Sequence, residues 1–299
     1  MDREAYELYL KGRHHHFKVT GEEARKALDY FDQAVQRNPD FTDAHAFIAI
    51  ATMQLVLLGE LSPLAGYPVA REATRKASSL DDSSMEAHVA MGEVRMYADW
   101  NWAEAEKEYQ KGLALDPGAS RPYWNYAYHY LTPMGRFEEA IAEGKKAIEL
   151  DPANVMAGFF LAYEYYFARR YDLAEAELTK VLELEPNYAP AHGILAVVYV
   201  QQEKYAEAIL EAERYVSLGG RVATSLPLLV VAYARGGREA EGRKVLQELE
   251  ALSQKSYVAP VVMSRAYASL NDADRAVAWL ESVRNARPTA RAAEGRPAF

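Results

Sequence analysis

The residue types best suited to chemistry in this sequence are its seven histidines. Three of them, His14, His15 and His16, are adjacent and raise the question of a metal site. Neighbouring residues on a helix point about 100° apart, so three consecutive rings cannot converge on one ion. We therefore expect a solvated turn at this position, and a fortuitous metal site is the alternative.

His45, His88 and His192 recur at one position of a repeating pattern. A residue that recurs with the period of a repeat occupies a stacking position, and such positions do not converge into a triad or a ligand set. We predict a packing role for these histidines. Several acidic residues of the same pattern are interpreted as a solvated surface and not as general acids: Glu138, Glu139, Glu175, Glu177, Glu207 and Glu211.

Other chemical signatures are missing from the sequence. It contains no cysteine, which excludes disulfides, thiol nucleophiles and thiolate metal sites. It also contains no phosphate-binding glycine loop, nucleophile elbow or metal-ligand spacing. We therefore assign no catalytic, cofactor-binding or metal-binding residues and expect a protein that is not an enzyme.

The elements that would position a binding site follow from a repeat, which is clearest at 153–186 (ANVMAGFFLAYEYYFARRYDLAEAELTKVLELEP). Small and apolar residues mark one face of each of two helices: Gly158, Leu161, Ala162 and Tyr165 in the first, and Ala174, Leu178 and Val181 in the second. Two short amphipathic helices cannot bury both faces alone. Each unit must therefore stack on neighbours of the same kind.

These residues resemble a tetratricopeptide repeat. The resemblance implies an all-α, right-handed superhelical solenoid of about eight stacked antiparallel helix pairs over 1–285, followed by a polar C-terminal tail at 286–299. The approximate units are 1–39, 40–82, 83–117, 118–152, 153–186, 187–220, 221–254 and 255–288. The N-terminal units are longer than the later ones, and we attribute the difference to loop insertions.

Three segments receive a local interpretation. The first helix is expected near 2–12, so that the adjacent histidines fall in the turn before a second helix near 21–37. The segment 59–68 contains two glycines and two prolines and is predicted to be a loop, either folded back on the surface or acting as a lid. Trp100 and Trp102 are expected to wedge between neighbouring helix pairs, because exposure would leave much apolar area in water.

The other face of the first helices is the most informative feature for function. In the unit at 153–186 this helix is apolar nearly all round, and such a helix is either buried on both sides or a binding surface. In tetratricopeptide proteins, which the chain resembles, these positions line an inner groove that holds a peptide or a partner's helix. The residues predicted to line this groove are Met96, Arg121, Trp124, Tyr128, Met156, Phe159, Tyr163, Tyr166, Phe167 and Val197. The alternative is a groove filled by the chain's own segment 59–68 or 286–299.

The charge of the sequence narrows the choice of partner. The formal net charge is -9 at pH 7, which argues against a nucleic-acid backbone and favours a basic or apolar partner. The carboxylate clamp of some tetratricopeptide proteins is matched only at Asn125, so a C-terminal carboxylate is not expected as the ligand. No stretch resembles a signal peptide or a membrane span. We expect a cytoplasmic protein with a protein or peptide partner.

Two functions are consistent with these observations. The first is a non-enzymatic protein–protein interaction scaffold that binds an apolar or basic segment in its concave groove. The second rests on wording such as ADWNWAEAE and YFARRYDLAEAEL, which resembles the C-terminal tetratricopeptide regions of bacterial signalling proteins. That resemblance implies a sensory or regulatory module of a larger transcription regulator, cyclase or Ser/Thr kinase.

Overall fold

The computed structural model describes residues 2–286, and this part of the chain is built from helices and contains no β-strand. The predicted tail lies, from residue 287 onward, outside the described residues. The helices are α1 (Arg3–His16), α2 (Gly21–Arg37), α3 (Thr42–Leu57), α4 (Pro63–Leu80), α5 (Met85–Glu93), the π-helix η1 (Val94–Ala98), α6 (Trp102–Leu115), α7 (Ser120–Tyr126), the π-helix η2 (Ala127–Leu131), α8 (Phe137–Leu150), α9 (Val155–Phe167), α10 (Tyr171–Leu184), α11 (Ala189–Gln201), α12 (Tyr205–Gly219), α13 (Leu226–Arg235), α14 (Glu239–Ser253), α15 (Pro260–Ser269) and α16 (Ala273–Ala286).

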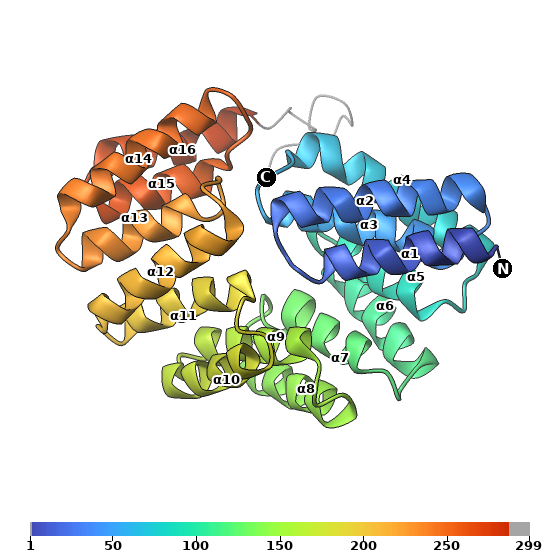
Figure 1. Cartoon of the computed structure of the whole chain (residues 1–299). Helices are drawn as coiled ribbons and strands as arrows, with labels where there is room; N and C mark the ends of the chain where they lie inside the picture. The colour runs from blue at the N-terminus through green and yellow to red at the C-terminus, as the bar shows by residue number, and fades with distance from the viewer. Residues whose placement is uncertain (1, 287–299) are drawn as a thin grey trace.

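Consecutive helices pack as pairs, each made of an odd-numbered first helix and an even-numbered second helix. The π-helices η1 and η2 continue the first helices α5 and α7. Figure 1 shows the pairs stacked in one arc, from α1 and α2 in blue through α7 to α10 in green to α13 to α16 in orange and red. The predicted all-α solenoid of stacked helix pairs is confirmed.

The two π-helices explain why units three and four are longer than the later units. Each contains a turn closed by a bond to the fifth residue back: the N–H of Asp99 donates to the carbonyl of Val94 (3.1 Å), and that of Thr132 to Ala127 (2.9 Å). In units three and four the N-cap of the second helix lies 17 positions after the N-cap of the first helix. In unit five it lies 16 positions after it. The predicted loop insertions are therefore wrong for these units, because the extra residue lies inside the helix.

The turn between α1 and α2 is shorter than predicted. α1 continues through the adjacent histidines to His16, whose side chain is only 5% exposed and whose Nδ1 lies 3.0 Å from Oε1 of Gln54 on α3. His15 is also held, with its Nδ1 2.8 Å from a carboxylate oxygen of Glu23. The predicted solvated turn is therefore wrong for His15 and His16, since packing against α2 and α3 extends the helix.

The segment 59–68 is a loop only in its first part. α4 begins at Pro63, where the hydroxyl of Ser62 accepts a hydrogen bond from the N–H of Ala65 (3.4 Å). Proline is favoured in the first turn of a helix, because its missing N–H would have no partner there. Gly66 serves close packing, since a Cβ at this residue would lie 2.3 Å from Val56. The loop prediction is wrong for this part because the proline and the glycine have helical roles.

Trp100 and Trp102 do not wedge between helix pairs. Their side chains are 66% and 45% exposed, and their ring centroids lie 6.4 Å apart. Trp100 has a positive φ of 55°, the left-handed turn conformation that Gly135 and Gly237 adopt at the equivalent position of other units. This position directly precedes the N-cap of the second helix. In unit three it is occupied by Trp100, whose indole lies in solvent. The prediction of a buried pair of indoles is therefore wrong.

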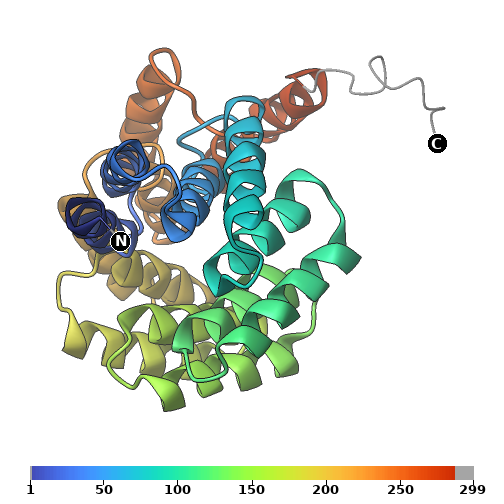
Figure 2. The same cartoon turned by 90° about the vertical axis from the view of Figure 1, so that its right-hand side faces the viewer.

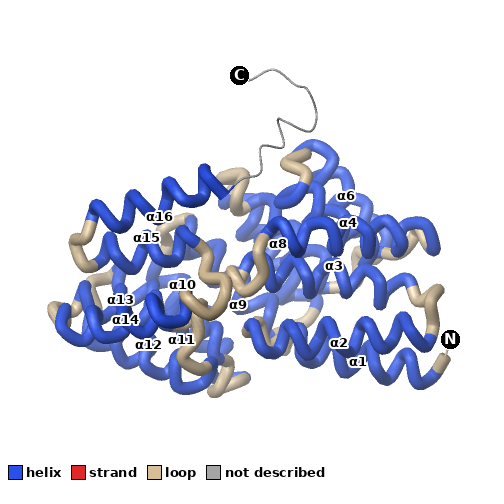
Figure 3. The backbone as a smooth tube through the Cα atoms, turned by 90° about the horizontal axis from the view of Figure 1, so that it is seen from above, coloured by secondary structure: helices blue, strands red, loops and turns tan. Residues whose placement is uncertain are grey.

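Figures 2 and 3 show the arc from two further directions. Side-chain and backbone contacts close it at two points. The turn between α1 and α2 packs Phe17 and Val19 against the apolar cluster around α9, and the hydroxyl of Tyr188 donates a hydrogen bond to the carbonyl of Phe17 (3.3 Å). The turn between α3 and α4 approaches the start of α15, where a Cβ on Gly59 would lie 3.1 Å from the Cβ of Ala259. The concave side is therefore covered in part by the chain's own N-terminal turns.

Two glycines in helices test how tightly the pairs are packed. A Cβ on Gly12 would lie 2.5 Å from Cε1 of Phe31, a ring with no exposed surface, whereas a Cβ on Gly112 would meet its nearest neighbour, Cγ2 of Val89, at 3.4 Å. Alanine gains about 1 kcal/mol over glycine in a helix, but overpacking costs about 1–3 kcal/mol. We expect Gly12→Ala to lower the free energy of unfolding by up to about 2 kcal/mol in urea denaturation, and Gly112→Ala to leave it unchanged or raise it. Equal effects of the two substitutions would contradict this packing.

Candidate functional site

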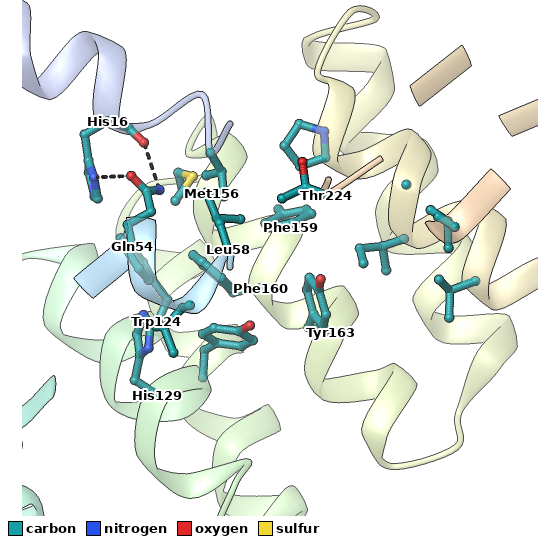
Figure 4. Close-up of a pocket in the computed structure, with 18 of the residues that line it drawn as sticks. His16, Gln54, Leu58, Trp124, His129, Met156, Phe159, Phe160, Tyr163 and Thr224 are labelled. Carbon is teal, nitrogen blue, oxygen red and sulfur yellow. Dashed lines mark hydrogen bonds between the residues drawn. The ribbon is translucent and has the colours of Figure 1, made fainter. Parts of the chain in front are cut away.

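The concave side holds a cavity of about 330 Å³ in the middle of the arc. Every first helix from α1 to α15 contributes residues to its wall, from His16 on α1 to Arg265 on α15. Figure 4 shows that the labelled aromatic side chains gather on one side of this space, with His16, Gln54 and His129 beside them. A cavity of this size accommodates a small molecule or a single large side chain.

The structure brings together six of the ten residues that the sequence predicted for the groove. Those that line the cavity are Trp124, Tyr128, Met156, Phe159, Tyr163 and Val197. The other four do not line it: Met96, Arg121, Tyr166 and Phe167. Met96 and Arg121 are buried but lie outside the cavity lining, whereas Phe167 is 46% exposed.

The aromatic wall is closely packed. Trp124 stacks on Phe160 with ring centroids 4.9 Å apart and an interplanar angle of 16°, and Tyr128 lies 4.3 Å from the same ring. Phe159 meets Tyr163 edge to face at 5.2 Å. Trp124, Phe159 and Phe160 are almost completely buried, so neighbouring side chains hold them in place. The wall is therefore a preformed apolar surface.

Because of the π-helix η2, a residue of unit four faces a different direction from the residue at the equivalent position of unit five. His129 and Glu164 are both the tenth residue after the N-cap of their first helix. His129 lines the cavity, but Glu164 faces α8, where a Cβ on Gly144 would lie 2.3 Å from its carboxylate oxygen. His129 is not among the predicted groove residues, because in a regular α-helix both residues would face the same way.

The polar end of the cavity is formed by Glu93, Asn125, His129, His16 and Gln54. Burial raises the pKa of Glu93 to about 8, and the charge of the nearby Arg121 only partly opposes this. Burial, followed by the charge of the same arginine, lowers the pKa values of His16 and His129 to about 3. Both imidazoles are therefore neutral at pH 7. Glu93 occupies the same concave repeat position as Tyr128 and Tyr163, so the helical period was a signal for it, although it is not among the predicted groove residues.

Arg121 takes part in a buried ion pair and not in the wall itself. Its Nη1 lies 2.9 Å from a carboxylate oxygen of Glu86, and its guanidinium lies 4.2 Å from the ring centroid of Phe47. Arg121 and Glu86 occupy the same repeat position in adjacent units, so stacking of the units brings opposite charges together. Breaking such a pair would leave a buried charge without a partner.

Two of the three recurrent histidines link the halves of their own helix pair. In His88 one ring nitrogen lies 2.6 Å from the carboxylate of Glu108 and the other 2.8 Å from the carbonyl of Asp82. His192 makes the same contacts with Glu211 (2.5 Å) and the carbonyl of Pro186 (3.0 Å). Hydrogen bonds to the glutamates raise the pKa values of both histidines. Glu211 is therefore a structural partner and not simply a solvated residue. Residues 2–286 contain no group of three or more side chains placed to hold a metal ion.

Comparison with known proteins agrees with this architecture. Residues 97–155 and 161–221 match the sequence profile of the tetratricopeptide repeat. Human IFIT1, solved as a dimer with PPP-AAAA, is 16% identical, with 90% of this chain and 70% of its own covered and a TM-score of 0.65. Yeast Tom70 is 18% identical, with 96% and 62% covered and a TM-score of 0.56. Pseudomonas aeruginosa PilF is 24% identical, with 74% and 96% covered and a TM-score of 0.51.

At these identities the structural similarity shows the fold, which is a helical-repeat solenoid. The match to the tetratricopeptide profile covers two stretches in the central part of the chain. No curated protein matches the sequence. Among the described helices, none combines the length and the apolar character needed to cross a bilayer.

The raised pKa of Glu93 has a measurable consequence for stability. Because its folded-state pKa of about 8 exceeds the usual 4.5, the folded protein keeps a proton that the unfolded chain releases. This contribution to stability is complete below pH 4.5 and is lost as the pH rises to 8, at about 1.4 kcal/mol per pH unit. His16 and His129 act in the opposite direction, but only below their usual pKa of 6.5.

We therefore expect Glu93→Gln to reduce the fall in unfolding free energy between pH 6.5 and 8, measured by urea denaturation. The matched control is Glu183→Gln, at an exposed residue of α10, which should retain the wild-type pH profile. Identical profiles for the wild type and Glu93→Gln would show that Glu93 is ionised in the folded protein.

Proposed function

We propose that this protein is a non-enzymatic interaction scaffold whose central cavity receives a side chain from an apolar or basic segment of a partner protein. The observation that carries this proposal is the preformed aromatic cavity on the concave side, to which first helices along the whole arc contribute. Rigid aromatic pockets of this kind serve as anchor points at protein interfaces.

The burial of the wall determines how much of a partner can enter. Trp124, Met156 and Phe159 are at most 6% exposed, so a long extended peptide cannot lie across them as it would in an open groove. A single anchoring side chain fits the volume of about 330 Å³, while the rest of the segment lies at the mouth. The formal charge of -9 favours a segment that carries positive charge.

A second candidate function is a sensory or regulatory module of a larger bacterial transcription regulator, cyclase or Ser/Thr kinase, in which the cavity binds a small molecule. The observation that favours it is the volume of the cavity, which falls at the lower end of the range for small-ligand sites. The reading frames that flank the coding sequence test this alternative. An in-frame effector domain would support it, and flanking frames that encode separate proteins would count against it.

The scaffold proposal is tested by filling the cavity. Val197 lines the cavity on α11, and Val197→Trp should occupy the space without changing the helical circular dichroism. The matched control is Leu210→Trp on α12, because Leu210 is 63% exposed and is not part of the cavity wall. We expect phage-displayed peptides selected on the wild type to bind Leu210→Trp equally and to lose at least about tenfold in affinity for Val197→Trp. Failure to select peptides, or equal binding to all three proteins, would contradict the proposal.

A further inference from the structure

The polar end of the cavity contains an acidic group that pairs with no cation among the described residues. Glu93 is 2% exposed, and it lines the cavity at the end of α5. Within residues 2–286 its carboxyl group makes no hydrogen bond, and Nε2 of His129 lies 3.8 Å away, too far for one. A buried carboxylate without a partner is costly, so a ligand that supplied one would gain affinity.

The basic groups that face Glu93 cannot neutralise it. Arg121 on α7 is paired with Glu86 at 2.9 Å and lies against the ring of Phe47. His129 on η2 and His16 on α1 are neutral because burial lowers their pKa values. The amide group of Asn125 donates to the carbonyl of Arg121 (3.2 Å), and its oxygen accepts no hydrogen bond from a described residue. This end of the cavity therefore offers acceptors to a ligand.

An anionic ligand would find little to bind. Among the described residues that line the cavity, Arg265 is the one with a permanent positive charge, and its side chain is exposed on α15. The charge of Arg265 influences the pKa values of Tyr163 and Tyr166. The charged groups that shift the pKa of Glu93 are instead Arg121 and Glu86. An anion next to Glu93 would also repel it whenever Glu93 is ionised. The charge distribution therefore favours a cation.

The aromatic wall lies beside the acidic group. His129, which approaches Glu93, packs edge to face on Tyr128 with ring centroids 4.8 Å apart, and Tyr128 lies 5.3 Å from Tyr163. Tyrosine and tryptophan rings attract a cation at their faces and cover the apolar groups attached to it. Among the described residues, the cavity thus combines an aromatic wall with one carboxyl group.

We infer that Glu93 and the aromatic wall bind an ammonium group carried on an apolar stem. The stem packs against Tyr128, Phe160 and Tyr163, and the ammonium donates hydrogen bonds to Glu93 and to Oδ1 of Asn125. Such a group occurs as the lysine side chain of a partner segment or as a free alkylamine. The inference rests on the proposed function in part, because it names the chemistry of what enters the same cavity.

Binding of the cation is coupled to loss of a proton. Glu93, with a pKa of about 8, carries a proton at neutral pH, and that proton passes to solvent when the ammonium takes its place. The two histidines that line the cavity do not titrate in the same range, because His16 and His129 have pKa values of about 3. Burial also raises the pKa of the nearby Glu86 carboxyl, whose charge adds to the upward shift at Glu93. The affinity for an alkylammonium ion should therefore rise with pH up to about 8, by at most about tenfold per pH unit.

The test is a calorimetric titration of the full chain with n-hexylammonium chloride at pH 8, with 1-hexanol as the neutral probe of the same length. We expect saturable binding of hexylammonium that is at least about tenfold tighter than that of hexanol. Glu93→Gln should remove this preference and the pH dependence. The matched control is Glu164→Gln, because Glu164 is also buried and lacks a hydrogen bond but faces Gly144 of α8 outside the cavity. Its affinity for hexylammonium should equal that of the wild type.

The inference is overturned if hexanol binds as tightly as hexylammonium, or if Glu93→Gln and Glu164→Gln behave alike. The pH profile of the wild type provides a second measurement that does not depend on a variant. The two sources of the cation are separated by comparing a selected lysine peptide with its Nε-acetylated form. Weaker binding of the acetylated form identifies a partner's lysine as the source. If hexylammonium binds but no peptide can be selected, the inference holds for a free amine and the proposed scaffold function fails.

Discussion

Contacts of the N-terminal turns with the middle and the far end of the arc determine what the concave face can bind. The turn that carries Phe17 packs on the α9 cluster and accepts a hydrogen bond from Tyr188, and Gly59 meets the start of α15 at Ala259. These contacts join parts of the chain that are remote in sequence. Without them the inner aromatic face would be an open groove. With them it is a cavity of about 330 Å³, which selects a side chain or a small ligand over an extended peptide.

Units three and four contain four buried ionisable groups that lie close to one another. Glu86 and Arg121 form a buried ion pair there, and Glu93 and His129 lie beside it at the cavity. Buried charges are weak evidence for stability, because desolvation offsets much of their attraction. The same two units contain the π-helical turns, a feature that is frequent at functional sites. Departures from regular packing and from regular helix geometry therefore coincide at the polar end of the cavity.

The sequence predicts the parts of the fold that depend on local periodicity. The small and apolar stripe at 153–186 predicts the helix pairs, and the opposite stripe predicts six residues of the cavity wall, since both follow from the helical period. One extra residue lengthens a unit equally in a loop or in a helix, so the π-turn that directs His129 inward could not be predicted. Closure of the arc depends on small angles between pairs that accumulate over the whole chain. For this reason the contact of Phe17 with Tyr188 has no signal in the sequence.

The most direct test of the closed arc is a disulfide cross-link between its ends. The chain has no cysteine, so the double variant Gly59→Cys, Ala259→Cys would contain a single pair of thiols, at positions where the two Cβ atoms lie close to disulfide distance. A pair made of Gly59→Cys and Leu210→Cys, with Leu210 exposed on α12, serves as the control. We expect rapid formation of an intramolecular disulfide in the first variant, detected by intact mass and by mobility on a non-reducing gel, and none in the control. A first variant that stays reduced, or that links only between molecules, would show that the arc is open in solution and would contradict the closed cavity.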